Sequence, residues 1–243
     1  MKDDDDILKN LQHSLGNLKG NFHVLESSIP VKQQMEYFHF SEKVKKDKTI
    51  RDISIEDQIS ALLNPDSSIE EKKYFMVKIA GSANVTAYRA LEAYCLHPDP
   101  ELTDWSKMAL MEARVALEAD LSDEKQIFIS TGLGGKGNNL RFFGLFKSAE
   151  LKPFSDYQKE LIEREFPFNI EKNGGEVESL DVKENYITLV FLMHFNTNIK
   201  HVLDEVVIEC NQYGDFIKTA YMVTNVKIYG EEEIQKELEK DRR

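Results

Sequence analysis

Cysteine, proline and long apolar runs are scarce in this sequence. The 243 residues include two cysteines, Cys95 and Cys210, which share no metal-type spacing with each other or with a pair of histidines. We predict that both are buried free thiols, as in proteins from a reducing compartment. The longest strongly apolar run, residues 189–193, is far shorter than the ~20 residues of a membrane helix. The N-terminus lacks the apolar segment of a signal peptide, so we expect a cytoplasmic protein without membrane insertion.

Positive charge is also scarce. Lysine and arginine number 31 against 43 aspartates and glutamates, which gives a formal net charge of −12. Nucleic-acid binding needs a broad positive surface, so nucleic acid is disfavoured as a partner. A local exception is the lysine-rich run from Lys43 to Arg51. Together with Arg141, it leaves an RNA- or ribosome-associated protein as one alternative hypothesis.

Residue patterns that carry catalysis or bind metals are missing as well. The six histidines include no pair spaced i, i+4 and no H-E-x-x-H, so we predict no metal site. There is no G-x-S-x-G. Ser130 precedes Thr131 at the end of a predicted strand, where a nucleophile can sit, but the sequence offers no base for it. We therefore expect no cofactor, and the lack of these patterns favours a protein that is not an enzyme.

The residues up to 122 have a helical pattern. Apolar residues recur at helical spacing over residues 7–19, whereas the charged run 42–48 is predicted to be a linker or loop. Between residues 54 and 121, four helices follow one another with short turns between them. Their predicted N-caps and boundaries are Ser54, Pro65, Ser67, Asn84 and Pro100. This spacing is typical of antiparallel helical hairpins.

Residues 97–110 read His-Pro-Asp-Pro-Glu-Leu-Thr-Asp-Trp-Ser-Lys-Met-Ala-Leu. The Asp-Pro before a helix and the apolar stripe within it resemble the second helix of HEAT-like (armadillo-type) repeats. Asp104 departs from the family, in which an arginine is common there. The resemblance implies a short α-solenoid with a protein-contact surface, and fewer than three repeats are seldom stable alone. Trp105 fits the helical core, although an exposed Trp105 would mark a contact surface.

After residue 121 the apolar pattern changes from helical to alternating. Strands are predicted at 127–131, 140–146, 177–182, 186–195 and 216–229, and helices at 155–166 and 198–213. The order is ββαββαβ, and without its first strand it is the ferredoxin-like βαββαβ arrangement. We therefore predict an α+β protein with an antiparallel sheet. Its expected parts are a helical domain at 1–122, a ferredoxin-like domain at 123–230 and a charged C-terminal tail at 231–243. We expect the tail to be a polar helix or a frayed end.

The segment 130–139, Ser-Thr-Gly-Leu-Gly-Gly-Lys-Gly-Asn-Asn, holds four of the 12 glycines. It contains a formal G-x-G-x-x-G, but a dinucleotide site needs a helix directly after the glycines, and here a strand is predicted. A P-loop needs a hydroxyl residue after its lysine, whereas Lys136 is followed by Gly137. No protein-kinase motifs follow this strand–glycine–strand arrangement, so a kinase nucleotide loop is excluded too.

Two interpretations of this segment stay open. In the first, it is a hairpin loop whose glycines supply positive φ. In the second, it binds an anion or a partner through backbone N–H groups, with Lys136 and Arg141 supplying positive charge. The candidate binding residues are Ser130, Thr131, Gly132, Gly134, Gly135, Lys136, Gly137, Asn138, Asn139 and Arg141.

The sequence as a whole predicts a non-catalytic cytoplasmic protein with an interaction or regulatory role. We expect it to bind another protein through its helical surface and the glycine-rich segment. The main alternative is a sensor of a small anionic ligand, a phosphate or a nucleotide, bound by residues 132–139. The pattern specifies neither the identity of the partner nor an oligomeric state.

Overall fold

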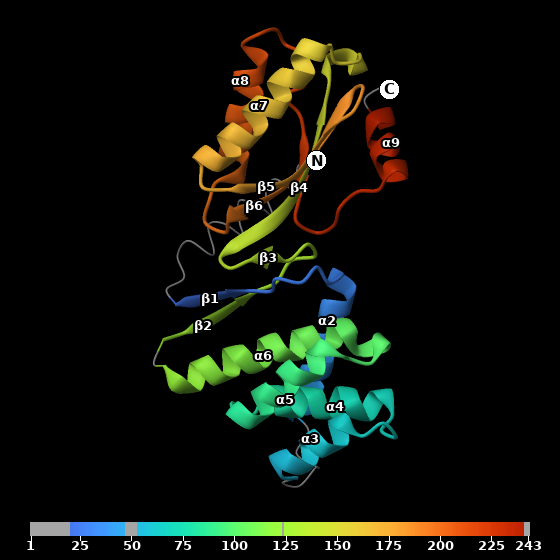
Figure 1. The fold of residues 1–243 in the computed structure, drawn as a ribbon, viewed down its shortest axis with the longest axis vertical. Helices are drawn as coiled ribbons and strands as arrows, with labels where there is room; N and C mark the ends of the chain where they lie inside the picture. Colours follow the sequence, from blue (N-terminus) through green and yellow to red (C-terminus); the bar gives the residue numbers. More distant parts are fainter. Residues whose placement is uncertain (1–19, 47–52, 123, 241–243) are drawn as a thin grey trace. The chain divides into compact units, whose positions relative to one another are not determined.

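The computed structural model describes residues 20–46, 53–122 and 124–240 (Figure 1). They form an α+β structure that divides into two compact units, with the boundary between Ser130 and Thr131. We predicted this boundary at 122/123, which would separate the last strand of the first unit from its partner. No described helix has both the length and the apolar character needed to cross a membrane.

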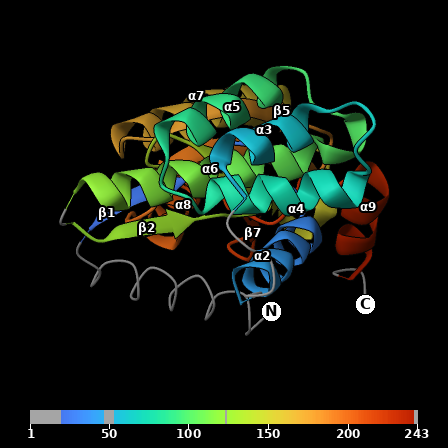
Figure 2. The ribbon, with the colours of Figure 1, turned by 90° about the horizontal axis from the view of Figure 1, so that it is seen from below.

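The first unit contains five helices of the described chain and a pair of short strands. Its elements are β1 (Asn21–Val24), α2 (Val31–Lys46), α3 (Ile55–Leu63), α4 (Ile69–Ala80), α5 (Val85–Leu96), the 3₁₀ helix η1 (Pro100–Leu102), α6 (Thr103–Leu121) and β2 (Gln126–Ile129). Helix α3 packs on α4 and α5 packs on α6, while α4 also contacts α6 and α3 contacts α5. Figure 2 shows α4, α5 and α6 as neighbouring helices, with α2 crossing below them.

Side-chain caps fix where these helices begin. The carboxamide of Asn84 and the hydroxyl of Ser54 each accept a backbone N–H of the first helical turn, as predicted. Helix α4 begins one residue later than predicted, because its N-cap is Ser68, which forms a reciprocal capping box with Glu71, and not Ser67. Local sequence signals therefore locate these helix ends to within a residue.

Helix α2 was not predicted from the sequence, and it extends into the charged run. The prediction of a loop over the charged run 42–48 is wrong for residues 42–46, which continue the helix. Tyr37, Ser41 and Val44 are buried at helical spacing and hold this part of α2 against the core. The helix predicted at 7–19 and the rest of the lysine-rich run, residues 47–52, lie outside the described residues.

The strand β2 belongs to the first unit. It pairs in parallel with β1, with Asn21 opposite Gln126 and Val24 opposite Ile129. The prediction that residues 127–131 open the second unit's sheet is therefore wrong. Alternation of apolar residues identifies a strand but not its partner, and the four residues of β1 are too few to show a period.

The second unit is an antiparallel sheet with helices on its faces. Its elements are β3 (Gly135–Lys136), β4 (Asn139–Lys147), η2 (Ala149–Leu151), α7 (Asp156–Lys172), β5 (Glu176–Val182), β6 (Tyr186–His194), α8 (Ile199–Asn211), β7 (Met222–Thr224) and α9 (Glu231–Lys240). The strands lie in the order β5-β6-β4-β7, and β3 forms a hairpin with the start of β4. Only residues 222–224 of the predicted last strand, 216–229, are in a strand.

Each face of this sheet has its own apolar layer. On one face Phe146 packs edge-to-face on Phe166 of α7, with ring centroids 5.0 Å apart. On the other face Phe143 clusters with Ile234 and Leu238 of α9. Residues 231–240 of the charged tail are thus a helix, one of the two forms predicted for it, but the docking of this helix on the sheet was not predicted. Two apolar residues spaced i, i+4 in a highly charged segment are enough to dock a helix.

Candidate functional site

The tip of the glycine-rich segment is a tight β-hairpin. Lys136 pairs with Asn139, which leaves Gly137 and Asn138 as the two turn residues. Gly137 has φ +58°, and a Cβ there would meet no atom within 4 Å, so the backbone conformation is what requires glycine. A positive φ at the first turn position is typical of two-residue hairpins.

Gly132 is required for a different reason. A Cβ at this position would lie 1.8 Å from the carbonyl oxygen of Val226. The adjacent N–H of Leu133 donates to the carbonyl of Asn225 at 3.0 Å. The chain before the hairpin is therefore pressed against residues 225–226 backbone to backbone, and only glycine fits there.

Part of the predicted binding segment lies inside the structure. Thr131, Gly132, Gly134 and Gly135 are buried, and the N–H of Gly134 donates to the carbonyl of Thr131 at 3.2 Å. Lys136, Gly137 and Asn138 are exposed, and Asn139 is half-buried. The N–H groups of Leu133 and Gly134, two of those expected to face an anion, thus donate to carbonyls within the protein.

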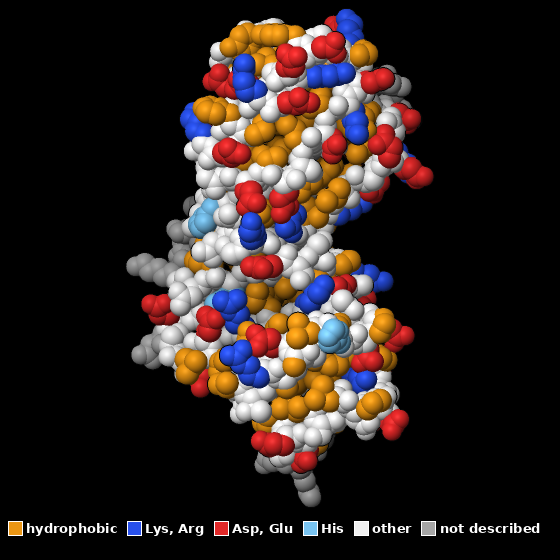
Figure 3. Space-filling model, in the orientation of Figure 1, with side chains coloured by type: hydrophobic (Ala, Val, Ile, Leu, Met, Phe, Trp, Pro, Cys, Tyr) orange, Lys and Arg blue, Asp and Glu red, His pale blue; other side chains and the backbone are white. Residues whose placement is uncertain are grey.

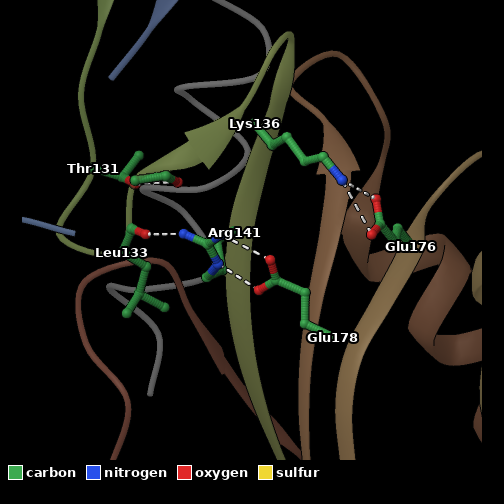
Figure 4. Close-up of polar contacts among 7 residues, drawn as sticks. Thr131, Leu133, Lys136, Arg141, Glu176 and Glu178 are labelled. Carbon is green, nitrogen blue, oxygen red and sulfur yellow. Dashed lines mark hydrogen bonds and ion pairs between the residues drawn. The ribbon is translucent and has the colours of Figure 1, made fainter. Parts of the chain in front are cut away.

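The two cations of the segment face carboxylates of the edge strand β5 (Figure 4). The Lys136 ammonium lies 3.0 Å from a Glu176 carboxylate oxygen. The Arg141 guanidinium binds Glu178 through two nitrogens, one of them 2.8 Å from Oε1, and a third nitrogen donates to the Leu133 carbonyl at 2.8 Å. The pKa of Glu178 is lowered, chiefly by this hydrogen bond from Arg141. The geometry therefore neutralises both cations within the protein.

The structure brings Lys136 and Arg141 together, but it does not gather all the predicted site residues. Ser130 ends the first unit, while the other nine residues of the segment belong to the second. An anion at Lys136 or Arg141 would have to displace or approach Glu176 and Glu178, at an electrostatic cost. The acidic partners lie on a strand far along the chain, so local sequence gave no signal of them.

Trp105 is half-buried in the core of the first unit. Its ring packs edge-to-face on Tyr37 and Phe40, at centroid distances of 5.2 and 5.4 Å. The Lys73 ammonium lies 4.9 Å from its ring centroid. Its Nε1 is buried and has no acceptor among the described residues. Trp105 is thus largely a core residue, with one ring face near a cation.

Two buried polar networks of the first unit were not anticipated. Glu112 of α6 accepts hydrogen bonds from Tyr37 and Ser41 and pairs with Lys45, all on α2. The pKa of Tyr37 is raised by burial and then by the charge of Glu112. These contacts tie α2 to α6. In sequence, their members look like ordinary surface positions of helices.

The second network centres on Asp99, directly before η1. The buried Lys72 ammonium lies 2.8 Å from the Asp99 carboxylate, which also accepts the Tyr94 hydroxyl at 2.5 Å. These two hydrogen bonds, that from Lys72 first, lower the pKa of Asp99. The network joins α4, α5 and the start of α6, so the Asp-Pro motif seen in the sequence has a structural role here.

Apolar side chains are exposed along one face of α2. Val31, Met35 and Phe38, at i, i+4 and i+7, are 42%, 48% and 37% exposed. Phe38 contacts Phe128 of β2 edge-to-face, and both line a groove of about 270 Å³ with Val115 of α6. Figure 3 shows one face of the molecule, where apolar patches alternate with charged side chains.

Nucleophile and metal chemistry find little support in the described residues. No group of three histidine, cysteine or acidic side chains there could hold a metal ion. Cys95 and Cys210 are both free; Cys210 is buried and Cys95 half-buried. Burial is the main cause that raises the pKa of each thiol, to about 12 for Cys210. Both thiols are therefore protonated and weakly nucleophilic at neutral pH.

Comparisons with known proteins identify no family. No family model matches the chain, and no curated protein matches it. A solved structure from Deinococcus radiodurans, described as a candidate transposase, is similar to 44% of this chain over 95% of its own length. The two are 15% identical, with a TM-score of 0.39, and a likeness at this level carries no argument about fold or function.

Proposed function

We propose that this chain is a non-catalytic cytoplasmic protein that binds another protein through the surface of its first unit. The observation that carries the proposal is the apolar face of α2 formed by Val31, Met35 and Phe38. Apolar residues at i, i+4 and i+7 beside a groove form the kind of surface on which a partner helix or strand can bury its own apolar side chains. The two free thiols fit a reducing compartment.

We further propose that the helices of the first unit are HEAT-like. The pairs α3/α4 and α5/α6 are consecutive hairpins, and the contacts of α4 with α6 and of α3 with α5 place equivalent helices side by side. This is how repeated hairpins stack in an α-solenoid. The resemblance of residues 97–110 to such repeats supports the same assignment, and solenoid surfaces commonly bind proteins.

For the second unit we propose a ferredoxin-like arrangement. The chain order β4-α7-β5-β6-α8-β7 and the spatial order β5-β6-β4-β7 support it. The hairpin β3 and the helix α9 are additions to that arrangement. Many unrelated functions use this architecture, so it adds no function of its own to the proposal.

The glycine-rich segment has a smaller part in this proposal than the sequence suggested. Only its tip, Lys136, Gly137 and Asn138, is exposed to a partner. The ion pairs of Lys136 with Glu176 and of Arg141 with Glu178 weigh against a phosphate or nucleotide sensor. The pairing of Arg141 weighs against the RNA-associated alternative in the same way.

The test compares matched surface variants of the full chain as baits. Wild-type protein, Met35→Ser/Phe38→Ser and the control Tyr157→Ser/Ile208→Ser are immobilised and exposed to native lysate. The control residues are exposed apolar side chains of the second unit. We expect one partner to bind the wild type and the control but not the α2 variant. Equal retention by all three baits would refute the α2 surface as the binding site.

A further inference from the structure

A pocket of about 320 Å³ lies beside Trp105, between α2, α4 and the start of α6. Its lining includes Ile29, Glu36, Lys73, Glu101, Asp104 and Trp105. It is distinct from the apolar groove at Phe38, although α2 contributes to both. A partner bound along α2 could therefore reach this pocket.

The charge of the pocket is negative. Its lining includes three acidic residues, Glu36, Glu101 and Asp104, and one lysine, Lys73. The Lys32 ammonium lies 3.9 Å from the Glu36 carboxylate and the Lys107 ammonium 4.0 Å from the Asp104 carboxylate, at the limit of an ion pair. Glu101 has no ion pair with any described residue. A ligand that complements this lining is a cation.

The Trp105 ring, which lines the pocket, already has an ammonium group over it, that of Lys73. The Lys73 ammonium is 4.9 Å from the Trp105 ring centroid and 2.8 Å from a Glu70 carboxylate oxygen. An ammonium over an indole face is the most favourable cation–π geometry. Since Tyr37 and Phe40 pack edge-to-face on the ring, its orientation is fixed before any ligand arrives.

We propose that this pocket binds a lysine side chain of the partner protein. The lysine's methylenes lie on Ile29 and Trp105, and its ammonium lies among Glu36, Glu101 and Asp104. Lys73 competes with it for the ring face and repels it, but Lys73 keeps Glu70 as a partner when displaced. This inference rests on the proposed function, because it names the side chain by which the partner is recognised.

Because Trp105 is the chain's single tryptophan, tryptophan fluorescence reports on this pocket. Full-length protein is titrated with Nα-acetyl-lysine methylamide, and the emission of Trp105 is followed. Nα-acetyl-norleucine methylamide, which lacks the ammonium, is the matched neutral probe. We expect a saturable emission change with the lysine probe and none with the norleucine probe.

Charge variants test the sign of the interaction. Lys73→Met removes the competing ammonium but keeps the apolar stem, so we expect the affinity for the lysine probe to rise about threefold or more. Glu101→Gln/Asp104→Asn should lower it about fivefold, because each exposed charge pair contributes modestly. Lys78→Met is the matched control, since Lys78 lies 5.7 Å from the Tyr74 ring and does not line the pocket. It should leave the affinity unchanged.

Several results would overturn the proposal. Weaker binding in Lys73→Met, or equal binding of the norleucine probe, would show that the ligand is not a cation. Cadaverine binding tenfold more tightly than the lysine probe would assign the pocket to a free diamine instead. Retention of the partner by the Glu101→Gln/Asp104→Asn bait but not by the α2 variant would leave the proposed function intact and refute the lysine pocket alone.

Discussion

The glycine-rich segment of the second unit and the Trp105 pocket of the first unit treat charge in opposite ways. Lys136 and Arg141 each face a glutamate of β5, so their charges are matched within the protein. The pocket beside Trp105 has three carboxylates and one ammonium. Both cations of the glycine-rich segment are paired, whereas the pocket keeps one carboxylate, Glu101, without an ion pair among the described residues. The glycines of the segment meet the needs of its backbone geometry, whereas a carboxylate without an ion pair is what a cationic ligand can bind.

The largest expected effect tests whether the glycines are structural. Gly132→Ala would place a methyl group against the Val226 carbonyl, so we expect the free energy of unfolding to fall by at least about 3 kcal/mol. Gly137→Ala has open space and only the cost of its positive φ, about 1 kcal/mol. Urea unfolding followed by far-UV circular dichroism measures both. Similar losses for the two variants would contradict the close-approach argument.

The next prediction concerns the buried ion pair of the first unit. Lys72→Met leaves the Asp99 carboxylate with the Tyr94 hydroxyl but without its cation. We expect a loss of about 2 kcal/mol, below the full cost of an unpaired buried charge because Asp99 is partly exposed. Trp105 emission during urea unfolding reports on this unit. Lys32→Met, at an exposed position, should change the urea midpoint little. A Lys72→Met variant with the stability of the wild type would refute the network's role.

A smaller effect separates the two cations of the glycine-rich segment. Arg141→Met loses three hydrogen bonds to Glu178 and Leu133, and we expect a loss of about 1.5 kcal/mol. Lys136→Met breaks a pair that is more than half exposed on both sides, so less than about 0.5 kcal/mol should be lost. Hydrogen exchange of peptides from β4 gives the local readout. Equal protection in the two variants would mean that the guanidinium does not hold β3 and β4 to β5.

The smallest effect is a pH dependence. Because the folded-state pKa of Glu178 is lowered, its ion pair stabilises the fold above the unfolded pKa, near the ordinary 4.5, and the contribution is lost as pH falls through the folded value. Wild type should therefore exceed Glu178→Gln in urea midpoint at pH 7. The difference should shrink on acidification below pH ~4.5. A difference that stays constant down to pH 3 would contradict the assignment of this carboxylate.

Local structure was largely predictable, and pairing between distant residues was not. Amphipathic spacing and caps such as Ser54 and Asn84 predicted α3 and α5 through the residues of the helices themselves. The partner of β2, the docking of α9 through Ile234, and the extent of α2 depend on contacts across the chain. Sequence periodicity contains no information about such partners, so those elements were missed or assigned wrongly.

The same distinction between local structure and distant pairing holds for the candidate site. A hairpin turn at the glycines was predicted, but its first strand was expected at 127–131; the observed first strand is β3, and β2 pairs with β1 instead. The neutralisation of Arg141 by Glu178 joins residues of separate strands. Lys72, near the start of α4, has the pattern of an ordinary surface lysine. The excess of carboxylates beside Trp105 likewise emerges only when α2 and α6 are brought together.

The parallel pairing of β1 with β2 has a consequence for how the chain folds during synthesis. His23 and Gln126, 103 residues apart in sequence, are joined by a hydrogen bond of 2.7 Å across this pair. The helical hairpins between them have local contacts and can form early, but β1 has no partner until β2 has left the ribosome. The first unit therefore closes only after its last strand emerges. Until then β1 lacks the strand with which it pairs in the folded unit.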